Sequence, residues 1–399
     1  MKILQLCNRV PYPLTDGGAI AMFAMTQSLS DAGCEVHMLA INTQKHFVEI
    51  DKLPDWFHAK VKLYTVDAAT DVTPHGAFFN LFSTRSYNLI RFDIPAFHKK
   101  LAQLLTEHKY DVVQLEGLFL SMYIPTIRKH STALVSMRGH NVEYLIWERL
   151  AASTASFFKK KYLQLLAKRL KREEISVLQQ LDCIVPISTI DEQIYRQQGA
   201  KMPMLVCTAG VDENLLEAKP AEVKKGTLFH LAAMNWQPNV EAVNWFMQSI
   251  WPKVKVSFPQ THLFLAGKDM PDAMMKQNGK QVTVCGQVND AVQFMQDKQI
   301  MLVPLLSGSG MRIKIIEGMA LGKVIVSTSI GAEGIDCTSG KNILLADSAE
   351  EFCNQIALAI SDSELCNRLS KNAKALVQQK YTNRSIISKL ISFYSNLLK

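Results

Sequence analysis

The sequence lacks the patterns that mark several classes of protein. Its eight cysteines include no C-x-x-C pair, which argues against a zinc ribbon, a thioredoxin-like redox site and a disulfide framework. We therefore expect reduced thiols, most of them buried in apolar stretches. No apolar run approaches the roughly 18 residues of a membrane span. The opening MKILQLCNRVPYP predicts a strand and a loop rather than a signal peptide, so we expect a cytoplasmic protein.

Long blocks of one charge are absent as well. The formal net charge of +8 over 399 residues is a modest excess that suits an anionic small molecule, nucleic acid or an anionic membrane surface. Without an arginine-rich tail or a basic block, we expect no nucleic-acid partner. The chain also contains no Asp-x-Asp pair. We therefore expect no metal ion, and no other cofactor, at the site.

The residues that are present predict a soluble α/β protein. The chain is 48% hydrophobic and 20% charged, as is usual for a globular protein with a sizeable core, and its length suggests two to three domains. In the first half, short apolar runs alternate with helical patterns, which predicts a parallel sheet covered on both faces. The predicted strands are 3–7, 36–41, 61–66, 111–115, 133–138 and 183–186, and the predicted helices are 19–32, 96–107 and 157–181.

A second α/β pattern follows a polar segment that contains proline and glycine. Its predicted strands are 228–231, 262–266, 282–285, 300–304 and 324–327, and its predicted helices are 240–254, 291–296, 311–321, 349–360, 363–379 and 385–398. We divide the chain into a first domain 1–207, a linker 208–225, a second domain 226–380 and a final helical segment 381–399. The final helix packs either on its own domain or back on the first one.

The strongest candidate site is the run LVPLLSGSGMRIKIIEGMALG, residues 302–322. A buried strand leads into a glycine-rich loop with Gly308, Ser309 and Gly310, and a helix follows at once. Such a turn lies at the carboxyl edge of a parallel sheet, where ligands bind. Glycines let the backbone approach a ligand, and the first helical N–H groups can bind phosphate.

Arg312 and Lys314 add positive charge to that predicted helix start. Basic residues oppose the helix dipole there unless an anion is bound, which favours a phosphate site over a plain turn with solvated side chains. Glu317, on the same helix, is suited to accept hydrogen bonds from two sugar hydroxyls. The spacing does not match a Walker A loop, and no G-x-G-x-x-G follows the first strand, which argues against a dinucleotide oxidoreductase.

Several segments, taken in order, resemble family 4 retaining glycosyltransferases. They are ILQLCNRVPYPLTDGGAIAMFAMTQSLSDAGCEVHMLA, LFHLAAMNWQPNVEAVNWFMQSIWP, THLFLAGKD, VTVCGQVND and LVPLLSGSGMRIKIIEGMALGKVIVSTSIGAEGI. The resemblance covers nearly the whole chain. It implies the GT-B fold, in which two Rossmann-like domains face each other across a cleft. It also implies transfer of a sugar from a nucleotide-diphosphate sugar to a glycan or lipid-linked acceptor.

The resemblance assigns a role to individual residues. Gly17 and Gly18 match a loop near the donor phosphates and the reacting sugar, and His140, in RGHNVE, matches a histidine that faces the donor sugar. Gly286 and Val288 match a strand end that borders the nucleotide base. Glu317 matches the second glutamate of the family's Glu-x7-Glu pattern, which binds the ribose.

One position departs from the family's pattern. Ser309 stands where the first glutamate of the Glu-x7-Glu pattern is expected, so the donor sugar is held differently here. Arg312 and Lys314 then supply the charge at the diphosphate. The implied reaction retains the anomeric configuration and proceeds by front-face displacement without a metal ion. A sugar-nucleotide epimerase of the same architecture, or a non-catalytic sugar-nucleotide-binding protein, is the alternative.

Several further features have both a functional and a structural interpretation. His140 follows a predicted strand at the ligand-binding edge, which favours a functional role over a structural one, and Arg138 is a weaker candidate for the same site. Glu116 fits an acceptor contact and a surface-loop carboxylate equally well. Glu333 is better explained as structural. The basic amphipathic stretch FFKKKYLQLLAKRLKREE suits peripheral contact with the inner face of a membrane, although a solvated helix face explains it more simply.

Overall fold

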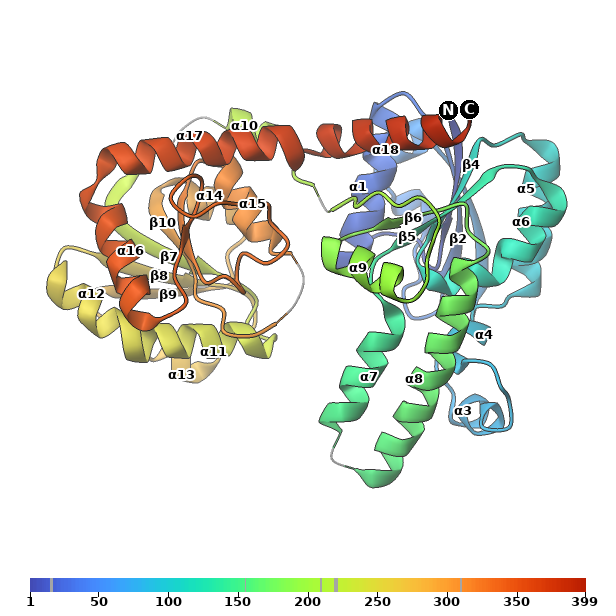
Figure 1. Ribbon diagram of the computed structural model, residues 1–399, viewed down its shortest axis with the longest axis horizontal. Helices are drawn as coiled ribbons and strands as arrows, with labels where there is room; N and C mark the ends of the chain where they lie inside the picture. Colours follow the sequence, from blue (N-terminus) through green and yellow to red (C-terminus); the bar gives the residue numbers. More distant parts are fainter. Residues whose placement is uncertain (15–16, 155, 209, 219–221, 309–310) are drawn as a thin grey trace. The chain divides into compact units, whose positions relative to one another are not determined.

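The computed structural model describes residues 1–399 except 15–16, 155, 209, 219–221 and 309–310. The chain divides into two compact units (Figure 1). Unit 1 contains Met1–Thr208 and Ile386–Lys399, and unit 2 contains Ala209–Ser385. Within the described residues, each unit is built on one parallel six-stranded sheet with helices on both faces.

The strands of unit 1 are β1 (Lys2–Cys7), β2 (Glu35–Thr43), β3 (Val61–Ala68), β4 (Val112–Glu116), β5 (Leu134–Gly139) and β6 (Cys183–Pro186). Its longer helices are α1 (Gly17–Asp31), α5 (Pro95–Glu107), α7 (Glu143–Ser153), α8 (Phe157–Leu178), α9 (Thr189–Gln197) and most of α18 (Asn383–Leu397). Shorter helices are α2 (Asp55–Lys60), α3 (Pro74–Asn80), α4 (Tyr87–Ile90), α6 (Ile124–His130), and the 3₁₀ turns η1 (Ile50–Lys52) and η2 (Leu118–Tyr123).

The strands of unit 2 are β7 (Lys224–Leu231), β8 (His262–Ala266), β9 (Val282–Gly286), β10 (Lys298–Val303), β11 (Val324–Ser327) and β12 (Leu344–Leu345). Its helices are α10 (Asn214–Glu217), α11 (Gln237–Trp245), the π-helical turn η3 (Phe246–Ile250), α12 (Trp251–Ser257), α13 (Asp272–Met275), α14 (Ala291–Gln296), α15 (Ile313–Ala320), α16 (Ala349–Ser361) and α17 (Ser363–Lys380). The π turn separates the predicted helix 240–254 into α11 and α12, next to Pro252, which has no backbone donor.

Both sheets have the same strand order. Unit 1 runs β3-β2-β1-β4-β5-β6, and unit 2 runs β12-β11-β10-β7-β8-β9, which is the same doubly wound order taken from the opposite edge. Successive strand residues alternate between two cores, so that Ile3 and Cys7 face one cluster while Leu4 and Leu6 face the other. Burial on both faces explains why the strands are continuously apolar.

Helix α18 packs its apolar face into the core of unit 1. Ile386, Ile387, Leu390 and Tyr394 belong to the same buried cluster as β1 and β2. The Tyr394 hydroxyl lies 2.9 Å from Gln114 Oε1 and 2.9 Å from Ser136 Oγ. The segment predicted as a linker, 208–225, contains α10 and the first residues of β7. In the part of the chain that the structure describes, no helix combines the length and hydropathy needed to cross a membrane.

Candidate active site

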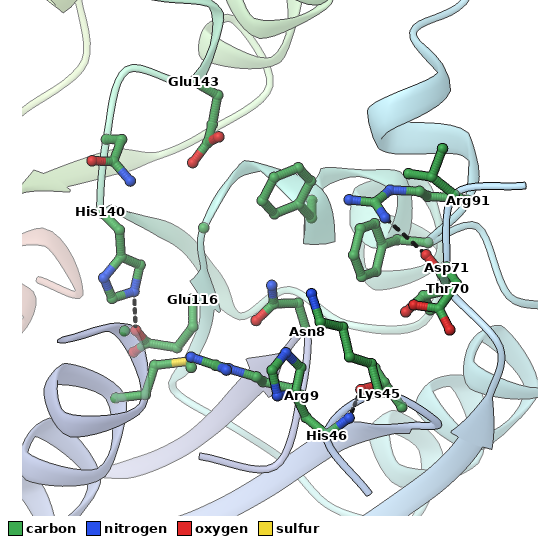
Figure 2. Close-up of a pocket in the computed structure, with 18 residues that line it drawn as sticks. Asn8, Arg9, Lys45, His46, Thr70, Asp71, Arg91, Glu116, His140 and Glu143 are labelled. Atoms are coloured by element: carbon green, nitrogen blue, oxygen red, sulfur yellow. Dashed lines mark hydrogen bonds and ion pairs between the residues drawn. The ribbon is translucent and has the colours of Figure 1, made fainter. Parts of the chain in front are cut away.

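A pocket of about 700 Å³ opens at the carboxyl edge of the unit 1 sheet (Figure 2). Five neighbouring strands contribute to it through the residues at or just after their ends. The lining includes Asn8 and Arg9 after β1, Thr43, Lys45 and His46 at and after β2, Thr70 and Asp71 after β3, Glu116 and Gly117 at the end of β4, and His140, Asn141 and Glu143 after β5. The pocket therefore lies at the place where doubly wound sheets bind ligands.

Glu116 is the centre of a buried hydrogen-bond network in this pocket. His140 Nε2 lies 2.8 Å from Glu116 Oε2, and Arg138 Nη1 lies 3.3 Å from the same oxygen. Gln114 and Gln5 donate to Oε1 at 2.5 and 3.3 Å. Arg138 also donates to the carbonyl of Ala21 in α1 at 3.0 Å. The network thus connects β1, β4, β5 and α1.

This environment keeps the Glu116 carboxylate ionised. Burial by itself would raise its pKa, but the Arg138 guanidinium and the hydrogen bonds from His140 and Gln114 outweigh burial, and the pKa is lowered. Glu116 is the last residue of β4 and only 2% exposed. The alternative of a surface-loop carboxylate is therefore wrong, because the strand extends one residue further than predicted.

The same network fixes the orientation of His140. An ionised carboxylate only accepts, so the Nε2 atom of His140 carries the proton in their shared hydrogen bond. In the neutral ring, Nδ1 is then an acceptor. Gly139 and Tyr195 hold the following loop in place: the Tyr195 hydroxyl donates to Asn141 O at 3.0 Å, and a Cβ at Gly139 would lie 2.8 Å from that hydroxyl. Arg138 and His140, both weighed from the sequence, are brought together here.

Several charged residues of this pocket were missed from the sequence. Arg9, Lys45 and His46 lie along one part of the lining, and Asp71 and Arg91 lie opposite His140 and Glu143 (Figure 2). Arg91 Nη1 donates to the carbonyl of Thr70 at 2.8 Å. Most of these residues directly follow a strand, so the rule that parallel strands end at one ligand-binding edge would have found them.

Glu143 and Glu174 form a buried acidic pair beside the pocket. The Glu174 carboxylate accepts from the backbone N–H groups of Glu143 and Tyr144 at 3.1 and 3.0 Å. Burial raises the pKa of each carboxyl to about 7, against opposing hydrogen bonds from Asn141 for Glu143 and from Tyr144 and Glu143 for Glu174. Glu143 therefore titrates near neutral pH at the pocket wall.

The predicted glycine loop lies at the start of α1. Gly17 is the first residue of that helix, and Gly18 lines the unit 1 pocket. The structure brings Gly18 to the same pocket as His140. The carbonyl of Ala21, one turn further along α1, accepts from Arg138, so the helix is tied to the charged network.

Unit 2 has its own pocket of about 510 Å³ at the carboxyl ends of β7 to β10. Of the predicted site residues, Val288, Arg312 and Lys314 line it, together with Trp236, Asn239, Gly267, Lys268 and Gln287. The Arg312 guanidinium lies over the Trp236 ring, 4.9 Å from its centroid, and burial lowers its pKa. A partly desolvated cation packed on an aromatic wall is well placed to bind an anion.

The helix that carries the basic residues begins later than predicted. Helix α15 starts at Ile313, and Arg312 is its N-cap residue with an extended backbone. Lys314 lies in the first turn, where its Nζ is 2.5 Å from Glu317 Oε2. Glu317 is outside the pocket lining and reaches it through this contact with Lys314. The structure thus pairs the residue predicted for the ribose with one predicted for the phosphate.

The loop before α15 is held by contacts to α11. Gly308 has a φ of +113°, and a Cβ there would lie 2.5 Å from the Trp236 ring, so only glycine fits. Ser307 Oγ donates to Glu241 Oε2 at 3.1 Å. Gly286 is the last residue of β9, next to the lining residue Gln287. Ser309 and Gly310 lie outside the described residues.

His230 was not singled out from the sequence, yet it lines this pocket. It lies on β7, is 4% exposed, and its Nδ1 is 2.8 Å from the carbonyl of Leu302 on β10. A carbonyl only accepts, so Nδ1 carries the proton, and burial lowers the pKa and keeps the ring neutral. Its Nε2 is then an acceptor, with no hydrogen-bond partner among the described residues.

Within the described ranges, no group of three His, Cys, Asp or Glu side chains is placed to hold a metal ion. The free cysteines are buried or partly buried except Cys285, which is exposed.

Comparisons with known proteins give a consistent result. Residues 225–362, which span unit 2 from β7 to α16, match the family described as Glycosyl transferases group 1. The whole chain is 22% identical over 403 residues to an uncharacterized 44.6 kDa protein in the cps region of Klebsiella pneumoniae, covering 98% of both sequences.

Among the solved structures of similar fold are two that match over almost the whole chain. Anabaena HepE in complex with UDP has a TM-score of 0.68 at 15% identity, with 99% of this chain and 100% of that chain covered. Sucrose-phosphate synthase from Thermosynechococcus elongatus has a TM-score of 0.67 at 16% identity, covering 100% and 99%. The likeness confirms the fold class predicted from the sequence, α/β with the GT-B architecture.

Proposed function

We propose that this protein is a glycosyltransferase that moves a sugar from a nucleotide-diphosphate sugar to an acceptor. The observation that carries the proposal is the unit 2 pocket, where Arg312 and Lys314 meet the start of α15 beside Trp236. This pocket lies within the residues that match Glycosyl transferases group 1. Cationic side chains and free helical N–H groups together suit a diphosphate.

The donor is a nucleoside-diphosphate sugar, and uridine is the first nucleoside to test. HepE is similar in fold and was solved with UDP and with UDP-glucose, which supports that choice. The base borders Gly286 and Val288, and Glu317 binds the ribose once the diphosphate draws Lys314 away from it. Gly308, Ser309 and Gly310 let the backbone approach the phosphates.

The leaving diphosphate gains negative charge as the bond to the sugar breaks. Arg312 and Lys314 stabilise that charge, so the reaction needs no metal ion. The anomeric configuration is retained by front-face displacement, in which the departing phosphate accepts the acceptor's proton. Gly17, Gly18 and His140 contact the donor sugar, and the hydrogen bond to Glu116 holds the His140 ring in one orientation.

The unit 1 pocket binds the acceptor, a glycan or a lipid-linked saccharide. Its Asn, Asp and Glu side chains match the hydroxyl-rich surface of a sugar. We place the activity in polysaccharide biosynthesis, and the relative from the cps region supports this. A cytoplasmic location stays a prediction.

The test is Arg312→Ala, assayed for UDP-sugar binding by calorimetry and for sugar transfer. We expect a loss of about one to three orders of magnitude, as for one preorganised charge contact. Glu317→Gln should weaken donor binding in the same direction. Arg368→Ala, at an exposed position on α17, is the matched control and should leave both readouts unchanged.

Three results would contradict the proposal. Normal binding and turnover in Arg312→Ala would remove this diphosphate site. Conversion of the donor alone to its epimer would identify an epimerase. Donor binding without transfer to any acceptor of a broad panel would identify a non-catalytic binding protein.

A further inference from the structure

Five phenylalanine side chains of unit 1 are exposed in two clusters. On and after α3, Phe78, Phe79 and Phe82 are 58%, 70% and 80% exposed. At the start of α8, Phe157 and Phe158 are 65% and 85% exposed. Single exposed apolar residues are common, but grouped aromatic rings of this exposure mark a surface that binds something.

The rings of each cluster pack mainly on one another. Phe78 lies 5.9 Å from Phe79 and 5.8 Å from Phe82 between ring centroids, and Phe157 lies 5.7 Å from Phe158. Each cluster thus presents a small apolar surface outside the cores of unit 1. We call the five side chains together the aromatic surface.

Basic residues accompany the aromatic surface. Lys159, Lys160 and Lys161 directly follow Phe158, and none of them forms an ion pair with a carboxylate of the described residues. Lys161 Nζ lies over the Phe157 ring at 5.8 Å. The acidic residues of α8 are at its other end and are engaged: Glu173 accepts from Ser86 N at 2.5 Å, and Glu174 is buried.

The two clusters are held on one rigid framework. Helices α7 and α8 form an antiparallel hairpin that projects from the sheet, and α3 lies beside α8 (Figure 1). Arg169 on α8 donates to the carbonyls of Asn80 and Leu81 at 2.8 and 3.0 Å. Arg169 is about 18 Å along the helix from Phe157, at 1.5 Å per residue, so the two clusters lie at separate places along α8.

Both clusters are also connected to the walls of the unit 1 pocket. Asp71 and Val72, which line the pocket, immediately precede α3, and Glu143, which also lines it, is the first residue of α7. The α3 cluster thus follows one pocket wall closely along the chain, whereas the α8 cluster lies at the far end of the hairpin, because α7 leads away from Glu143 for 11 residues.

We propose that the aromatic surface docks unit 1 on an anionic phospholipid bilayer. Phenylalanine rings insert at the level of the headgroups and acyl chains, and the adjacent lysines are attracted to anionic headgroups. A partner protein that binds through an apolar groove would instead need one continuous apolar face on unit 1. Here the two clusters are separated along α8, and lysine ammonium groups flank the α8 cluster. Docking holds unit 1 at the bilayer surface, where a lipid-linked acceptor is carried.

The experiment is co-sedimentation of the full chain with vesicles of phosphatidylcholine alone or mixed with phosphatidylglycerol, without donor. We expect binding to the mixed vesicles that weakens as salt rises. Phe157→Ser with Phe158→Ser should lower that affinity by at least about tenfold, because two apolar rings no longer leave water. Phe79→Ser with Phe82→Ser should act in the same direction.

Two controls make the outcome decisive. Val256→Ser removes a 77% exposed apolar side chain of unit 2 and should sediment like the parent. Replacing Lys159, Lys160 and Lys161 by glutamine should weaken binding to the mixed vesicles only.

Absence of vesicle binding by the parent, or equal binding by the double-serine variants, overturns the proposal. A parent that self-associates in ultracentrifugation, with the serine variants monomeric, would assign the surface to a second copy of the chain. Vesicle binding is measured without any sugar donor, so its failure is distinct from failure of the proposed transfer reaction.

Discussion

The two units share a strand order but differ in the side-chain contacts between their two central strands. In unit 1, Gln5 on β1 reaches Glu116 on β4, within a network that holds an ionised carboxylate beside Arg138 and His140. In unit 2, His230 on β7 reaches a backbone carbonyl on β10, and cations stand at the pocket wall beside Trp236. The same topology thus supports a buried carboxylate–guanidinium pair in one unit and a cationic pocket wall in the other.

Breaking the buried pair of Glu116 and Arg138 should give the largest effect. Glu116→Gln leaves the Arg138 guanidinium buried without its counter-ion, so we expect a loss of about 3–5 kcal/mol in the free energy of unfolding. Hydrogen exchange should show the change in peptides from residues 1–208 and 386–399 and leave those from 209–385 protected as before.

His140→Ala is the matched variant for that prediction. It keeps the pair between Glu116 and Arg138, so stability should stay within about 1 kcal/mol of the parent, while transfer falls about a hundredfold or more. If Glu116→Gln unfolds at the same urea concentration as the parent, the network does not stabilise unit 1.

A smaller effect should follow in unit 2 from His230→Asn. The Asn amide can still donate to the carbonyl of Leu302. The substitution nevertheless removes the Nε2 acceptor that the His230 ring offers to a ligand hydroxyl or N–H group. We expect the affinity for UDP to fall about tenfold, or about 1.4 kcal/mol, with little change in stability. Calorimetry measures the affinity, and His230→Gln, which places a polar group nearer the Nε2 position, should recover part of it. Unchanged affinity in the Asn variant would show that Nε2 faces no ligand group.

The smallest effect concerns pH and unit 1 alone. Burial raises the pKa of Glu143 to about 7, so the folded state favours the protonated carboxyl. Proton binding by Glu143 stabilises the folded state fully below the pKa of the unfolded chain, near 4.5. This contribution is lost as the pH rises through 7. The melting temperature should therefore decrease between pH 5 and pH 8, and the decrease should be smaller in Glu143→Gln. An identical decrease in both proteins would place the titration elsewhere.

Much of the fold follows directly from the sequence pattern. Strands such as β6, β8 and β11 have the predicted bounds. A short apolar run between glycine or polar residues is too short for a typical helix and is best explained as a buried strand. Short helices such as α3 and α6 were missed, since seven residues make only about two turns, too few for a clear periodicity. The start of α15 was placed too early because Met311 and Arg312 are compatible with a helix, whereas Arg312, whose guanidinium packs on Trp236, has an extended backbone.

The candidate sites were less predictable than the fold. Arg312, Lys314 and His140 were predicted as site residues because each follows a predicted strand at the ligand-binding edge of a sheet, and the structure places all three in a pocket lining. The partnership of Glu116 with Arg138 and His140 depends on three side chains from two strands and the following loop meeting in space, which local sequence cannot specify. His230 was missed because a histidine inside an apolar strand has the same pattern whether or not its free nitrogen faces a pocket.

The position of α18 has a consequence for how the chain is made. Tyr394, Leu390 and Ile387 complete the core of unit 1, yet they are synthesised only after all of unit 2. On the ribosome, the first 208 residues emerge with one apolar face still uncovered, while unit 2 can close its own core first. The early half of the protein must therefore wait for the late half to be translated, and a chaperone that shields exposed apolar surface would act in that interval.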